Sequence, residues 1–206
     1  MKSGNFVNAS ALLLIVLTLI LGCKSKEERE RDERLEANKK ILSEKIENSK
    51  KTVDALNTKK DEWAKMSPPE KISDQPALNG KAIIVYRWAG GESEIKDEDI
   101  RDLGDVGARE ANEAKTVLQV SCFEIKAGEY TFQNREKTRV PAFFSRCETS
   151  LVDTEIPAIV HRKTFENKKI AETLNVNPKY SEIPKKVVAP NPHQEMRDFL
   201  KSLPKK

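Results

Sequence analysis

The stretch Lys81-Ala82-Ile83-Ile84-Val85-Tyr86-Arg87-Trp88 is filled by β-branched and aromatic side chains, which predicts a β-strand. Ala89-Gly90-Gly91 ends this strand. The same composition predicts further strands over 116–126, 128–133, 139–152 and 158–165. Turn residues at 127–128 and 153–155 make short connections, which favour antiparallel pairing. We therefore expect an α+β fold with a small, mainly antiparallel β domain over residues 81–178.

Residues 179–206 are predicted to form a Pro-rich basic tail that ends in a short helix. Prolines between 178 and 192 favour extended chain. Asn191-Pro192 is typical of a helix start, since Pro fits the first helical position. The apolar residues after it recur at helical spacing, at Met196, Phe199, Leu200 and Leu203. We expect this face to pack on the sheet.

Residues 23–67 are predicted to form a segment that starts at Cys23 and continues as a long charged helix. The segment 24–66 has neither Gly nor Pro, and its polar residues alternate in charge sign. Its apolar residues repeat every seven positions, with Leu35, Leu42, Leu56 and Trp63 in one phase and Ile46 and Val53 in the companion phase. This pattern fits a coiled coil with a second copy or with a partner, a single helix that docks on the β domain or stays in solvent, or a substantially disordered segment.

A linker is predicted over residues 68–80. Pro68 and Pro69 end the helix because proline removes an amide donor and restricts the residue before it.

The first 22 residues are predicted to be a signal peptide. The apolar run from 9 to 21 is too short to span a bilayer core of about 30 Å, but it fits the hydrophobic region of a secretory signal. The run ends in Ile20-Leu21-Gly22-Cys23 and a dense charged stretch follows. This segment resembles a bacterial lipoprotein signal with its lipobox. An ordinary secretory signal and an uncleaved anchor are the alternatives.

The resemblance implies that Cys23 receives a diacylglyceryl group and becomes the first residue of the mature protein, with palmitate-type acyl chains holding it on a membrane. Two or three chains anchor a protein far more firmly than one. The implied location is the cell envelope. Lys24 after the Cys favours the outer membrane over the inner one in a bacterium with two membranes.

The chain has three cysteines, Cys23, Cys122 and Cys147. If Cys23 carries lipid, the other two are free to pair, and an exported protein meets an oxidising compartment. We expect a Cys122–Cys147 disulfide, with two buried free thiols as the alternative.

No nucleophile, dinucleotide, phosphate-loop or zinc-protease motif is present in the sequence. The two histidines, His161 and His193, stand far apart. The acidic run 92–105 is predicted to be a loop or a short helical turn, and a solvated segment fits it better than a calcium or acid/base site. We expect no enzyme activity, no catalytic residue, no cofactor and no metal site.

The composition excludes several classes of protein. Of 206 residues, 37% are hydrophobic and 34% charged, with a net charge of +4, which argues against a polytopic membrane protein and gives no indication of nucleic-acid binding. The β region is followed by a closing Phe199-Leu200-Lys201-Ser202-Leu203-Pro204. Together they resemble small exported bacterial domains of unknown function, a likeness that implies no activity.

The sequence favours an anchored binding or structural module of the cell envelope, with an envelope protein or an anionic polymer as candidate partner. An envelope hydrolase and a wall-polymer tether are the alternatives. The tether rests on a resemblance to the murein lipoprotein, which ends in a Lys as this chain does at Lys206. A binding module should expose an apolar patch, for which Tyr86, Trp88, Phe143 and Phe144 are the candidates.

Overall fold

The computed structural model describes residues 25–131, 139–170 and 184–206, so the predicted signal peptide and Cys23 lie outside it. Contacts divide the chain into two compact units, residues 1–45 and 46–206. The elements in chain order are α2 (Lys26–Asn57), α3 (Lys60–Lys65), β1 (Lys81–Arg87), β2 (Ser93–Glu94), α4 (Asp97–Leu103), the 3-10 helix η1 (Gly104–Val106), β3 (Ala114–Thr131), β4 (Arg139–Asp153), β5 (Ala158–Asn167), β6 (Val187–Val188) and α5 (His193–Ser202). In the described part of the chain, no helix is long and apolar enough to cross a membrane.

One mixed sheet forms the centre of the second unit, with the strand order β2-β1-β3-β4-β5 and β6 paired to β4. The long ladders β3–β4 and β4–β5 are antiparallel, which confirms the expected α+β class. The β1–β3 pair is parallel, contrary to the antiparallel order that short connections favour. The connection from β1 to β3 carries β2, α4 and η1, and a crossover of that length permits parallel pairing.

β3 is one strand of 18 residues, so the predicted hairpin turn at Ala127-Gly128 is wrong. The register with β4 shifts between Lys126 and Gly128, which makes Ala127 an extra residue in a continuous strand. A small residue beside a Gly fits such a bulge as well as it fits a turn. The predicted turn after Asp153 is present between β4 and β5.

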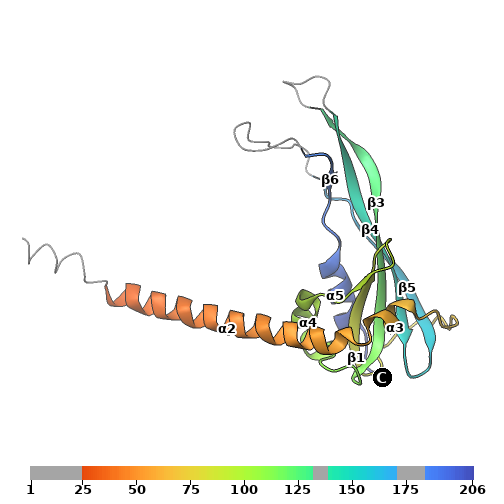
Figure 1. Cartoon of the computed structure of the whole chain (residues 1–206), viewed down its shortest axis with the longest axis horizontal. Helices are drawn as coiled ribbons and strands as arrows, with labels where there is room; N and C mark the ends of the chain where they lie inside the picture. The colour runs from red at the N-terminus through yellow and green to blue at the C-terminus, as the bar shows by residue number, and fades with distance from the viewer. Residues whose placement is uncertain (1–24, 132–138, 171–183) are drawn as a thin grey trace, which may run out of the picture. The chain divides into compact units, whose positions relative to one another are not determined.

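The sheet is covered on both faces, which explains why the run 82–86 of β1 is apolar without alternation. One cluster joins Leu56 of α2 and Trp63 of α3 to Val85 and its neighbours. The other cluster joins Met196 and Leu200 of α5 to the opposite face, as the sequence predicts. Figure 1 shows α3 and α5 on opposite sides of the strands.

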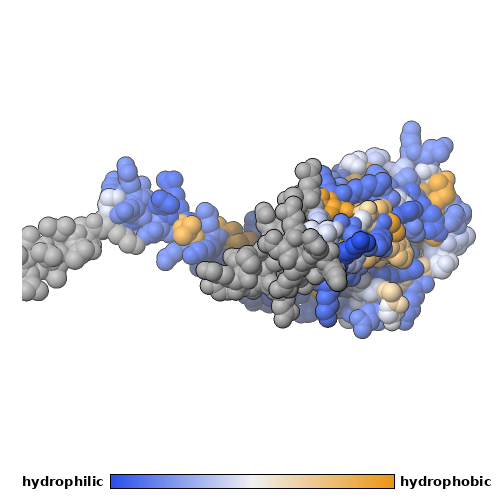
Figure 2. All heavy atoms as spheres, turned by 90° about the horizontal axis from the view of Figure 1, so that it is seen from above, coloured by the Kyte–Doolittle hydropathy of each residue, from blue (hydrophilic) through white to orange (hydrophobic). Residues whose placement is uncertain are grey.

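The predicted long helix is interrupted. α2 ends at Asn57, two residues in a turn follow, and α3 starts at Lys60. Residues of one heptad phase also differ in burial. Leu56 and Trp63 are buried, whereas Leu35 and Leu42 are each 53% exposed. The exposed apolar residues interrupt an otherwise hydrophilic helix surface (Figure 2).

Beyond the last β1–β3 pair, Arg87 with Ser121, β3 and β4 continue as an antiparallel ribbon, along which β4 also pairs with the end of β5 and with β6. We call this ribbon, residues 122–131 and 139–147, the arm (Figure 1). The Cys122–Cys147 disulfide lies at its base and joins directly opposite residues of β3 and β4, as predicted, with an S–S distance of 2.06 Å. It fixes the two strands where the covering helices and β1 end.

Candidate functional site

One face of the sheet is left open where α3 ends. The Gln119 side chain donates hydrogen bonds to the backbone oxygens of Trp63, at 2.7 Å, and Met66, at 2.8 Å, and so fixes the end of the helix. Beyond this point the sheet face is polar and hollowed. We call the hollow the groove; its volume is about 320 Å³, and its lining includes Arg87, Ser121, Phe123, Glu148, Ser150 and Arg162.

The strand register explains why these groove residues lie together. Arg87 pairs with Ser121, which pairs with Glu148, so three neighbouring strands place them in one row. Side chains at alternate positions of a strand share a face. Arg87 therefore continues the face of Val85, and the apolar floor under α3 becomes a polar floor in the groove.

The charges of the groove are unevenly compensated. Arg162 lies 2.7 Å from the Glu70 carboxylate, and Glu148 lies 3.4 Å from Arg146. Arg87 donates only to the backbone oxygen of Ala64, at 3.4 Å, and has no carboxylate partner among residues 25–131, 139–170 and 184–206. The groove thus holds one cation whose charge no described carboxylate balances.

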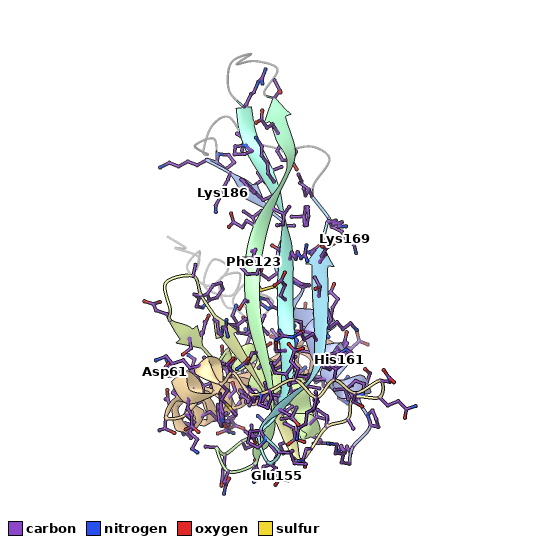
Figure 3. The ribbon with its side chains drawn as sticks, turned by 90° about the vertical axis from the view of Figure 1, so that its right-hand side faces the viewer. Asp61, Phe123, Glu155, His161, Lys169 and Lys186 are labelled. Atoms are coloured by element: carbon purple, nitrogen blue, oxygen red, sulfur yellow. A yellow bond between two sulfur atoms is a disulfide. The ribbon has the colours of Figure 1, made fainter. Side chains whose placement is uncertain are left out.

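An apolar surface on the arm borders the groove. Phe123 is 49% exposed and Ile125 is 37% exposed, on the same face of β3. Their cross-strand partners on β4 are Arg146 and Phe144. Figure 3 shows Phe123 part-way along β3, where the ribbon leaves the body of the sheet.

This apolar surface differs from the predicted patch. Tyr86 is buried, Phe143 and Phe144 are half-buried, and only Trp88 is exposed. The sequence shows Phe123 and Ile125 as ordinary alternating strand residues. Nothing local reveals that the covering helix α3 and the neighbouring strand β1 both end before them, so their exposure depends on the tertiary structure.

A second polar cluster lies on the opposite face, between β1, α4 and α5. The Tyr86 hydroxyl is 2.9 Å from Nδ1 of His193, and Lys96 Nζ is 3.3 Å from Nε2. Nearby, Arg197 Nη1 donates to Asp99 Oδ1 at 2.9 Å, and both side chains are almost completely buried. Asp99 Oδ2 and Arg197 Nε have no hydrogen-bond partner in the described structure.

Burial dominates the ionisation of this cluster. It raises the pKa of Tyr86 far above the ordinary range, and the negative charge of Asp99 adds to the rise. Burial also raises the pKa of Asp99, against the opposing effects of Tyr86 and Arg197. Burial and the nearby Lys96 and Arg197 cations lower the pKa of His193 from 6.5 to about 4. His193 is therefore neutral at pH 7 and joins α5 to β1.

His193 should make the fold sensitive to acid. Its pKa is lower in the folded chain, so between pH 6.5 and 4 the unfolded chain binds more protons and stability falls as the pH falls. The ring is half-exposed, so the expected loss is about 1–2 kcal/mol rather than the full linkage value. Urea unfolding at pH 7 and pH 4 measures it. His193→Asn should be less sensitive to pH by this amount, and an unchanged pH dependence would contradict the assignment.

The other predicted residues lie in separate places. His161 stacks on Phe199 with ring centroids 5.6 Å apart, and the described residues contain no group of His, Cys, Asp and Glu that could hold a metal ion. Lys206, the candidate residue for a wall-polymer tether, donates a hydrogen bond from Nζ to Asp153 at 3.2 Å. In the acidic run, α4 confirms the predicted short helical turn, but Asp99 is buried, so the expectation of a solvated segment is wrong at that residue.

Comparison with known proteins gives little. No family model matches the chain, and no curated protein matches it. A crystal structure of a Xanthomonas campestris protein described by the DUF330 family model is similar over 52% of this chain and 78% of that chain, with 13% sequence identity and a TM-score of 0.29. At this TM-score the likeness supports no statement about function.

Proposed function

We propose that this chain is an exported lipoprotein, anchored through Cys23, whose β domain binds another component of the cell envelope through the arm and the groove. Residues 20–23 support the anchor by their likeness to a lipobox. The Cys122–Cys147 disulfide fits an oxidising compartment outside the cytoplasm. In this proposal the protein is not an enzyme, and the outer membrane is its favoured location.

The observation that carries the binding role is the exposed apolar surface of Phe123 and Ile125 beside a polar groove. Phe123 and Ile125 are exposed on β3, whereas Ala142, Ser145 and other β4 residues of the arm are buried. An exposed apolar surface of this kind is costly unless a partner or a charged rim covers it. The other polar cluster is a weaker candidate, because Tyr86 and Asp99 are buried and hold α5 in place.

The anchor has a direct test. Cells that produce the chain are grown with labelled palmitate, and the protein is isolated beside a Cys23→Ala variant. The proposal expects label in the wild-type protein alone and Cys23 as the first residue of the mature chain. A labelled variant, or a mature chain that starts elsewhere, would remove the anchor.

The binding surface is tested by placing a photo-crosslinking amino acid at position 125 in living cells. Ile72 and Ile156 are matched controls, since both are exposed apolar residues outside the arm. A discrete adduct at 125 that is absent at 72 and 156 supports the arm as a binding surface. Adducts of equal yield at all three positions would show non-specific contact and contradict it.

Self-association through α2 is a second candidate role, favoured by the exposed Leu35, Ile41 and Leu42. Leu56 and Trp63 belong to the core, so removing the whole helical segment would unfold the β domain rather than test the seam. The suitable variant is Leu35→Glu with Leu42→Glu in the full chain. Sedimentation should show a dimer that this change converts to a monomer, and a monomeric wild type excludes the role.

A further inference from the structure

We infer that the groove binds an anionic group, a carboxylate or a phosphate, that is attached to an apolar moiety. This assignment rests on the proposed binding role and adds the chemistry of the ligand. The guanidinium of Arg87 recognises the anion, and Phe123 at the rim contacts the apolar part.

Arg87 supplies the charge recognition. It stands at the end of β1 on the groove face, and only the Ala64 oxygen, at 3.4 Å, engages it in the described structure. A guanidinium presents several N–H donors in a planar fork that matches carboxylate and phosphate oxygens. The hydroxyl of Ser121, its cross-strand neighbour, adds a small donor on the same row.

Phe123 supplies the apolar contact. It lines the groove two residues beyond Ser121 on the same strand face, so the ring lies next to the row that holds Arg87. Met66 and Ile159 add apolar surface to the lining. A ligand with a charged end at Arg87 and an apolar end at Phe123 would contact both the cationic and the apolar part of the groove lining.

Glu148 repels an anion in the groove. Its removal therefore gives a second test of the assignment, with an effect on affinity opposite to that of removing Arg87. Glu148 is the cross-strand neighbour of Ser121, and its charge is offset by Arg146 at 3.4 Å. Because the offset is incomplete at an exposed site, the remaining negative charge weakens anion binding. Arg87→Gln and Glu148→Gln should therefore change affinity in opposite directions.

The experiment uses the full chain in nanodiscs of neutral phospholipid and three probes. Phenyl phosphate carries both features, inorganic phosphate only the anion, and phenyl glucoside only the apolar ring. Saturation-transfer NMR and equilibrium dialysis measure binding, with Arg31→Gln as a control at an exposed arginine of α2.

The wild type should bind phenyl phosphate more tightly than either of the other probes. Arg87→Gln should weaken this binding about tenfold or more, since a charge-assisted hydrogen bond is lost. Glu148→Gln should tighten it by about threefold at low ionic strength. Phe123→Ser should reduce phenyl phosphate binding to the level of inorganic phosphate, and Arg31→Gln should leave it unchanged.

Any other order of affinities contradicts a particular part of the inference. Equal affinity for inorganic phosphate overturns the apolar half, and equal affinity for phenyl glucoside overturns the anionic half. No binding by a folded wild type overturns the whole inference. In that case crosslinking at position 125 still decides the proposed function by itself.

Discussion

Replacing Arg197 with Ala should lower the free energy of unfolding by about 3–5 kcal/mol, since it leaves Asp99 buried without its charge partner. Asp99 is 1% exposed, and Arg197 Nη1 is its hydrogen-bond donor at 2.9 Å. The pair joins α4 to α5, so its loss should also loosen the C-terminal helix. Urea unfolding followed by circular dichroism at pH 7 measures the change.

Two further variants separate charge from packing. In Asp99→Leu with Arg197→Met no buried charge remains, and this double variant should recover most of the lost stability. Lys51→Ala removes the exposed Lys51–Glu47 pair, which has an N···O distance of 2.8 Å, and should change stability by less than about 0.5 kcal/mol. If Arg197→Ala costs no more than Lys51→Ala, the pair is not buried in solution.

The sequence does not reveal this pair, for a physical reason. Asp99 stands in a run of carboxylates, and composition alone makes every member of such a run look solvated. Burial of one member depends on α5 packing against α4, from residues about a hundred positions away. Arg197 in turn interrupts the apolar stripe of Met196 and Leu200 and gives no local sign of a partner.

Local chemistry predicts much of the rest. The β-branched run predicts β1, the spaced apolar residues predict α5, and the strand positions of Cys122 and Cys147 suit the disulfide. The direction in which β1 and β3 pair is harder to predict from the sequence, because their parallel ladder depends on the crossover connection between them. The groove cannot be predicted from the sequence either, since it forms only where α3 ends and three strands lie in register.

Leu56→Ala should lower the free energy of unfolding by about 3 kcal/mol, whereas Leu42→Ala should change it by less than about 0.5 kcal/mol. Both leucines occupy the same heptad phase of α2, so the sequence gives no reason to distinguish them. Leu56 has no exposed surface and packs in the cluster with Trp63 and Val85, while Leu42 is 53% exposed. Thermal and urea unfolding of the two variants measure the difference.

This pair of variants also decides between the interpretations of the helix that the sequence left open. If both changes are costly and the cost at Leu42 grows with protein concentration, a coiled-coil seam holds Leu42 in solution. If neither is costly, the C-terminal part of α2 does not dock on the sheet. The expected difference in cost between Leu56→Ala and Leu42→Ala would show that residues of one heptad phase have different roles along α2. Its last turns stabilise the β domain, and its earlier turns remain an apolar stripe available to a partner or a second copy.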